Sequence, residues 1–293
     1  MSDAPAVSAA PLRRLDAAWV DWLRSNLSRG CSEPDLVRMM GENGFSPETI
    51  TTALDVCRIG LASAGATVSG DVSSYRPDPI RIDDVNHPTV LDRTVTLAMR
   101  MQDPNVAVID DFLSAEECAS LIALAADRVK RSVVVSDTAG ENEVHASRTS
   151  EGTWFPKGEQ ALVTLIEQRI EALTGIPAEN GEGLQVLSYG PGAEYRAHHD
   201  YFSVQSVGGR AHIGAAGQRI ATLVLYLNDV EDGGDTAFPD LRLSVKPRAG
   251  RALYFEFHNA AGQVDPRCLH AGMPVKAGRK WIATKWYRQS RWG

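Results

Sequence analysis

The chain has 293 residues, of which 43% are hydrophobic and 23% are charged, an ordinary globular composition that excludes a disordered or collagen-like chain. The net charge is -7, from 30 Lys and Arg against 37 Asp and Glu, so binding to nucleic acid is not expected. The Cys residues show no CxxC spacing, which excludes a zinc-knuckle pattern and a disulfide scaffold.

The first residues give no targeting signal. They lack a basic start that leads into an apolar stretch, so a secretory signal is not expected. The chain contains no run of about 18 apolar residues, so we expect neither a transmembrane helix nor a membrane partner. These patterns predict a cytoplasmic protein.

The N-terminal third is predicted to be helical. Residues 1–12, rich in Ala, Ser and Pro, form an expected disordered lead, and residues 13–64 an expected helical bundle. Apolar residues recur there at helical spacing, beginning with Leu15, Trp19, Trp22 and Leu23. Residues 65–105 are rich in Gly, Ser, Pro and Asp, so they are predicted to be a linker.

The remaining residues, 106–293, are predicted to be the main domain. Two helices are expected first, one after the capping pattern Ser114-Ala-Glu-Glu117 and one over 158–173. Short β-rich segments separated by Gly and Pro turns follow at 184–189, 219–227, 243–246, 252–257 and 281–287. Many short strands between turns are typical of a barrel or a jelly roll.

The densest group of chemically active residues is Tyr195-Arg-Ala-His-His-Asp200. On an extended strand, alternate side chains share a face, so His198 and Asp200 point to one side and His199 to the other. His270 follows in a second strand-and-turn region. Two imidazoles and one carboxylate match the facial triad of non-heme Fe(II) oxygenases, with hydrolysis at a zinc ion as the alternative.

A lysine near the end of the chain favours the oxygenase. Lys280 begins the last β-rich segment, ten residues after His270. An oxygenase that uses 2-oxoglutarate needs a fixed cation for the remote carboxylate of this co-substrate, and Lys280 can supply that charge-assisted contact. Zinc hydrolysis gives no role to Lys280.

Three blocks of the chain resemble the prolyl 4-hydroxylase family of Fe(II)/2-oxoglutarate-dependent dioxygenases. They are the stretch 187–202 around the first histidine, the stretch 217–228 with 233–239, and the stretch 269–275 with 278–286. The resemblance implies an α+β fold, with a double-stranded β-helix (jelly roll) core, supporting helices and the small N-terminal helical bundle as an addition. It also implies hydroxylation of an unactivated C–H bond, with consumption of O2 and release of succinate and CO2.

The resemblance also assigns roles to residues. The Fe(II) ligands and catalytic residues are then His198, Asp200 and His270. Lys280 binds the remote carboxylate of 2-oxoglutarate, and the same pocket is lined by Tyr189, Thr222 and Tyr226. The residues that face the substrate are Tyr195, Arg148, Arg219 and Trp286. Ascorbate is the expected reductant.

The substrate implied is proline or a related cyclic amino acid, either free or within a peptide; another amino acid or a small metabolite is the alternative. A free amino acid needs a cation for its carboxylate, for which Arg148 and Arg219 are candidates. A peptide needs a groove, which residues 136–155 and 202–217 are expected to shape as mobile lids. The helical bundle is expected to bind a partner or peptide, to form a homodimer, or to pack on the catalytic domain.

Overall fold

The computed structural model describes residue 15 and residues 17–28, 31–63, 75–131, 134–135, 142–143, 149–204 and 206–293. The expected disordered lead, residues 1–12, and Arg148 lie outside these residues. The chain divides into two compact units, Met1–Ser69 and Gly70–Gly293. Among the described residues, none of the helices has both the length and the apolar character needed to span a membrane.

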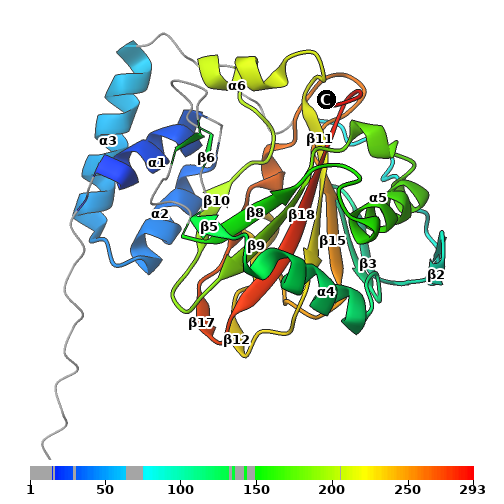
Figure 1. Cartoon of the computed structure of the whole chain (residues 1–293). Helices are drawn as coiled ribbons and strands as arrows, with labels where there is room; N and C mark the ends of the chain where they lie inside the picture. Colours follow the sequence, from blue (N-terminus) through cyan, green and yellow to red (C-terminus); the bar gives the residue numbers. More distant parts are fainter. Residues whose placement is uncertain are drawn as a thin grey trace, which may run out of the picture. The chain divides into compact units, whose positions relative to one another are not determined.

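The first unit contains the helices α1 (Ala17–Ser28), α2 (Glu33–Glu42) and α3 (Pro47–Ser63), shown in blue in Figure 1. Its aromatic residues pack on one another: the ring of Trp19 lies edge-on to Trp22 and to Phe45, with centroids 5.0 and 4.8 Å apart. All three side chains are buried. The apolar stripe expected from the sequence therefore forms the core of this unit.

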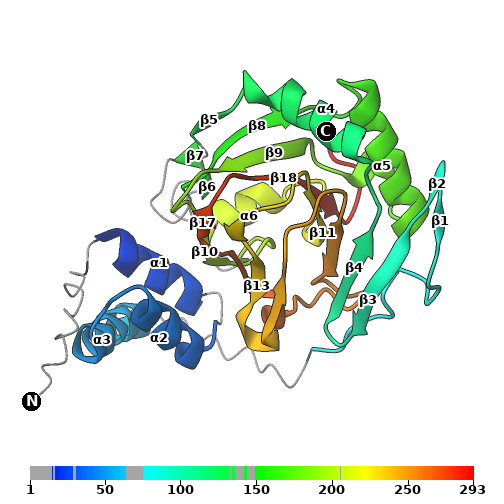
Figure 2. The same cartoon turned by 90° about the horizontal axis from the view of Figure 1, so that it is seen from below.

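The second unit is built on two antiparallel sheets. The larger has the order β3-β4-β15-β11-β18-β9-β8-β5 and the smaller the order β10-β16-β13-β14. Figure 2 shows these strands arranged around a common interior. Aromatic residues of both sheets, such as Phe255 and Phe238, pack together in that interior. The predicted jelly roll is confirmed.

The strands of the larger sheet are β3 (Thr96–Gln102), β4 (Asn105–Asp110), β15 (Ala252–Glu256), β11 (Arg219–Tyr226), β18 (Lys280–Arg288), β9 (Leu184–Tyr189), β8 (Glu151–Phe155) and β5 (Lys130–Arg131). Those of the smaller sheet are β10 (Tyr195–His198), β16 (His270–Gly272), β13 (Thr236–Phe238) and β14 (Leu243–Val245). Short pairs are formed by β1 (Thr89–Val90) with β2 (Arg93–Thr94), β6 (Val134–Val135) with β7 (Asn142–Glu143), and β12 (Asp232–Gly233) with β17 (Val275–Ala277).

Two helices cover the outer face of the larger sheet. They are α4 (Ala115–Ala126), which begins with the predicted capping box of Ser114 and Glu117, and α5 (Ala161–Thr174). Along β11, Leu223 and Leu225 pack in the outer core with these helices, whereas Val224 and Tyr226 belong to the inner core. Successive side chains of a strand point to opposite faces, so one short strand serves both cores.

The expected linker, residues 65–105, is too long. Within it, β3 pairs along β4 at the edge of the larger sheet, and Ile82, Val90 and Val95 are buried in the outer core. The guanidinium of Arg169 in α5 binds Asp92 with two hydrogen bonds of 2.7 Å. The Pro- and Asp-rich composition around this edge strand concealed its short alternating pattern.

Candidate metal centre

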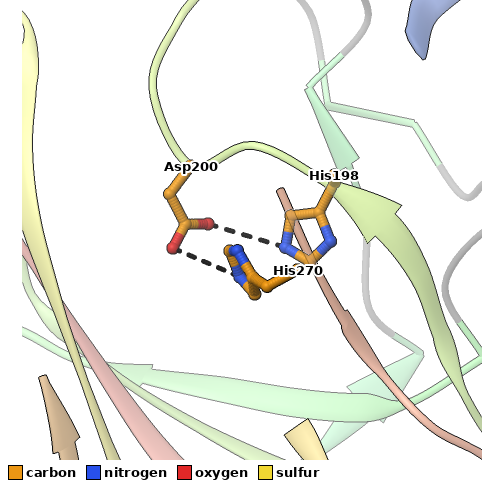
Figure 3. A group of neighbouring side chains, drawn as sticks. All are labelled: His198, Asp200 and His270. Carbon is orange, nitrogen blue, oxygen red and sulfur yellow. Dashed lines mark ion pairs between the residues drawn. The ribbon is translucent and has the colours of Figure 1, made fainter. Parts of the chain in front are cut away.

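The strand register brings the two predicted histidine ligands together. His198 ends β10 and lies directly opposite His270, the first residue of β16. Asp200 follows β10 by two residues and turns its carboxylate toward both rings (Figure 3). Its two oxygens each lie 3.6 Å from one Nε2 atom, of His198 and of His270.

Backbone carbonyls fix the orientation of both imidazoles. Nδ1 of His198 lies 2.8 Å from the carbonyl oxygen of Arg196, and Nδ1 of His270 lies 3.0 Å from the carbonyl oxygen of Cys268. A carbonyl oxygen only accepts hydrogen bonds, so each Nδ1 carries a proton and each Nε2 is the nitrogen left to face a metal ion. Burial, followed by the proximity of His270, lowers the pKa of His198 to about 4, so this ring is neutral at neutral pH.

The third donor, Asp200, is buried but remains an anion. Burial alone would raise its pKa, but His270, His198 and Arg219 outweigh that effect and hold the pKa well below its usual range. The hydroxyl of Thr222 donates a 2.7 Å hydrogen bond to Oδ2 of Asp200. Thr222, expected to line the co-substrate pocket, is thus placed where it orients the carboxylate.

The three side chains fit a bound iron ion. Their ligand atoms all lie within 4.8 Å of one another, and no other group of His, Cys, Asp or Glu in the described part of the chain has such an arrangement. Two imidazole nitrogens and one carboxylate oxygen are the donor set of a facial triad, which leaves positions open for other ligands. His199 points elsewhere, as predicted, with Nε2 2.8 Å from the carbonyl oxygen of Pro266.

Lys280 is the first residue of β18 and lies beside Tyr189 and Tyr226, whereas Trp286 is near the other end of that strand. Its Nζ is 5.5 and 5.7 Å from the centroids of these two rings, and the side chain is only 2% exposed. Within the described ranges, no hydrogen bond or ion pair joins this Nζ to another residue. Burial lowers the pKa of Lys280 to about 8, although Asp235 acts in the opposite direction. An unpaired buried ammonium is costly, which suits it to a carboxylate that arrives with a ligand.

The two tyrosines are buried beside Lys280 in the inner core. Tyr189 is the register partner of Lys280 across β9 and β18, and the hydroxyl of Tyr226 donates a 2.8 Å hydrogen bond to Thr236. Burial keeps the pKa of Tyr226 above its usual value, so it remains a donor. The structure therefore brings together Lys280, Tyr189 and Tyr226 as predicted. It adds Thr236, the first residue of β13, whose only sequence signal is the preceding Gly-Gly-Asp.

Aromatic side chains also lie near the triad. The ring of Tyr195 stacks on His198 with centroids 3.7 Å apart. Trp286, which is 7% exposed, packs against Trp154, which is 42% exposed, with centroids 5.6 Å apart. Tyr195 thus contacts a predicted iron ligand, and Trp286 is the register partner of Thr222, while their contact with a substrate stays a prediction.

Arg219 is not free to bind a substrate carboxylate. Its Nε and Nη2 donate hydrogen bonds of 2.7 Å to the two oxygens of Glu182, and its Nη1 donates to the backbone oxygen of Asp200 at 3.2 Å. Its role as a candidate for such a carboxylate is corrected: it positions the Asp200 segment. The partner is distant in the sequence, which is why Glu182 was missed. Arg148, the other candidate, is outside the described residues.

Known proteins share these features. Residues 184–288 match the 2OG-Fe(II) oxygenase superfamily. "Probable prolyl 4-hydroxylase 3" of Arabidopsis thaliana is 40% identical over 203 residues, 63% of this chain and 69% of that protein. "Prolyl 4-hydroxylase 5" of the same plant is 40% identical over 204 residues, 63% of this chain and 68% of that protein.

A solved structure agrees with these matches. The viral collagen prolyl hydroxylase from Paramecium Bursaria Chlorella virus-1, in complex with 2-oxoglutarate, superposes with a TM-score of 0.50 and 32% sequence identity, covering 62% of this chain and 95% of that one. The chain therefore belongs to the prolyl 4-hydroxylase family, and it is a prolyl hydroxylase that depends on Fe(II), 2-oxoglutarate and O2.

Proposed function

We propose that this enzyme hydroxylates proline within a peptide, with Fe(II) held by His198, Asp200 and His270. When bound, Fe(II) would allow 2-oxoglutarate and O2 to react, so that one oxygen atom of O2 enters succinate as CO2 is lost and the other converts a C–H bond of the ring to C–OH. The protein groups provide the ligand atoms and their orientation. His198 and His270 present Nε2 because carbonyls hold Nδ1, and Thr222 holds the carboxylate of Asp200.

The burial of Lys280 supports its role in binding the co-substrate. 2-Oxoglutarate carries a carboxylate remote from its 2-oxo acid end, and Lys280 is a buried cation with no partner among the described groups. The rings of Tyr189 and Tyr226 limit the position of its ammonium group. We therefore assign Lys280 to the remote carboxylate, with the two tyrosines beside it.

The observation that favours a peptide over a free amino acid as substrate is the ion pair of Arg219 with Glu182. A free amino acid brings a carboxylate and an ammonium group, and Arg219, a candidate for that carboxylate, is already bound to Glu182. Aromatic rings lie at the triad and near it: Tyr195 stacks on His198. Trp286, the register partner of Thr222, packs against the partly exposed Trp154. Such a surface suits a neutral proline ring in a chain. By its name, the similar viral enzyme acts on collagen, a polypeptide.

Three further expectations stay predictions: ascorbate as the reductant, a cytoplasmic location and a homodimer formed through the N-terminal helices. For the dimer, the structure narrows the choice of surface. Trp19 and Trp22 are buried within their own unit, so a dimer would use other side chains of α1–α3.

The substrate is tested by a screen for succinate release. The Fe(II)-loaded enzyme is given 2-oxoglutarate with either proline-containing peptides or free cyclic amino acids. We expect peptides to accelerate succinate release and to gain one oxygen atom by mass spectrometry, while free proline at the same concentration does neither. Equal or faster turnover of free proline would show that the peptide proposal is wrong, and turnover of another metabolite alone would favour the alternative class.

Replacing the proposed carboxylate-binding cation tests the co-substrate site. Lys280→Ala removes one charge-assisted contact, so we expect the KM for 2-oxoglutarate to rise by about tenfold or more. Steady-state kinetics at saturating peptide measure this, and the KM for the peptide serves as the internal control. A KM for 2-oxoglutarate that does not change would contradict the assignment.

The pH dependence of the same constant is a second test of Lys280. Only the protonated amine attracts the carboxylate, and the pKa of Lys280 is lowered to about 8. Binding is therefore complete below pH 8 and is lost above it, and the KM for 2-oxoglutarate should rise about tenfold from pH 7 to pH 9. Lys280→Arg is the control, because a guanidinium does not titrate in this range. The assignment fails if wild type and Lys280→Arg show the same pH profile.

The hydrogen bond from Thr222 to Asp200 predicts a loss of metal affinity. Thr222→Val keeps the shape but removes the donor, so we expect Fe(II) binding to weaken by about tenfold to a hundredfold, as for other groups that orient a metal ligand. Thr222→Ser retains the hydroxyl and should bind nearly as the wild type does. Metal titration without co-substrate measures both variants, and equal affinity in Val and Ser variants would rule this role out.

A further inference from the structure

A short helix, α6 (Val207–Ile213), follows Asp200 in the chain and precedes β11. It lies at one end of the barrel, beside the start of β11 (Figures 1 and 2). A seven-residue helix that contains two glycines, Gly208 and Gly209, is not stable by itself in water. A Cβ at position 209 would also collide with the carbonyl of Ser203, so the glycine permits a close turn. The position of α6 must therefore be set by the groups that hold it.

One buried side chain holds the end of this helix. Arg288, the last residue of β18, is 3% exposed, and its Nη2 donates hydrogen bonds to the backbone oxygens of His212 and Ile213, the latter at 2.9 Å. Its Nε donates to the backbone oxygen of Gly217 at 2.9 Å. A cation at a helix C-terminus satisfies the last carbonyls and complements the helix dipole.

The same guanidinium is joined to the metal centre. Nη1 of Arg288 donates a 3.0 Å hydrogen bond to Oε1 of Glu182, the carboxylate that also binds Arg219. Arg219 in turn donates to the backbone oxygen of Asp200. A continuous series of hydrogen bonds therefore runs from α6 through Arg288, Glu182 and Arg219 to the segment that carries the carboxylate.

Ring contacts form a second connection. Phe202 lies two residues after Asp200, and its ring stacks on His212 of α6 with centroids 5.3 Å apart and an interplanar angle of 18°. The guanidinium carbons of Arg219 and Arg288 lie 4.6 and 5.0 Å from the centroid of the same ring. Arg219 also lies over Trp286, at 4.1 Å. Arg219 thus contacts both Phe202, which packs on α6, and Trp286, which belongs to the aromatic surface proposed for the substrate.

We propose that Arg288 is a positioning residue for the peptide substrate, which it serves by fixing α6 and Phe202 as one wall of the substrate path beside Trp286. This inference rests on the proposed peptidyl substrate. It treats α6 as a fixed wall in place of the mobile lid expected over 202–217. Arg288 itself need not touch the peptide, because all its nitrogens already have protein partners.

The test compares two conservative substitutions of buried arginines. Arg288→Lys keeps the charge, but a single ammonium group cannot donate to Glu182 and to the α6 carbonyls at the same time as the guanidinium does. Arg169→Lys is the matched control: Arg169 is also buried and is bound by Asp92, Glu117 and the carbonyl of Phe112, but it lies in α5, which covers the outer face of the sheet. The assay uses a proline peptide from the substrate screen.

We expect Arg288→Lys to raise the KM for the peptide about tenfold and to release more succinate per hydroxyproline formed, because a displaced wall leaves the proline ring badly placed. The KM for 2-oxoglutarate should stay within about twofold, since Lys280 is at the other end of β18. Arg169→Lys should lower the melting temperature without raising the KM for the peptide. Equal peptide KM values in both variants, or a parallel rise in both KM values for Arg288→Lys, would overturn the proposal.

Hydrogen exchange of the α6 backbone tests, without any substrate, whether Arg288 holds this helix in place. The backbone amides of residues 210–213 should exchange faster in Arg288→Lys than in wild type, and at the wild-type rate in Arg169→Lys. Unchanged exchange in Arg288→Lys would overturn the proposal on its own. If the wild type hydroxylates no peptide, the proposed function fails, whereas the exchange result still decides whether Arg288 holds α6.

Discussion

Along β11 and β18, successive side chains point to opposite faces of the larger sheet, and this alternation determines where each functional group can lie. One face is covered by α4 and α5 and is filled with residues such as Leu223 and Ala283. The other face lines the interior of the barrel. Thr222 and Trp286 are register partners on that inner face, near the triad, and Lys280 occupies it at the far end of β18. The register therefore places Trp286 beside the Thr222 that binds Asp200 and places Lys280 six residues away along the same strand.

Two lysines of β18 show how the two faces differ in purpose. Lys280 and Lys285 are both almost fully buried, and in the sequence both simply flank an apolar run. Five positions separate them, so they lie on opposite faces. Lys285 faces the helices and forms an ion pair of 2.5 Å with Glu167 of α5. Lys280 faces the interior, without such a partner among the described residues. A buried pair is complete within the protein, whereas a buried single charge calls for a ligand.

Patterns that are local in the sequence could be predicted, and pairings over long distances could not. The His198–Asp200 spacing places two donors on one side of a strand by geometry alone, and Lys280 follows from its place at the start of a strand. The partner of Arg219 is Glu182, which lies before β9, and no spacing rule connects them. The hydrogen bond from Thr222 to Asp200 is another such contact, because only the packing of two sheets brings the hydroxyl to the carboxylate. In the linker prediction, composition was given more weight than the short alternation of β3.

The engagement of Arg219 explains how a cation can lie close to the metal centre without competing for its carboxylate. Were the guanidinium bound directly to the side chain of Asp200, it would neutralise the charge and occupy the oxygens that a metal ion needs. Glu182 takes the two-point contact in its place, and Arg219 reaches only the backbone oxygen of Asp200. The carboxylate of Asp200 then accepts a hydrogen bond from the neutral Thr222 hydroxyl, and its oxygens lie near the two imidazoles. Because Glu182 binds the guanidinium, Arg219 can support the Asp200 segment and lie over the ring of Trp286. The carboxylate of Asp200 stays available to a metal ion.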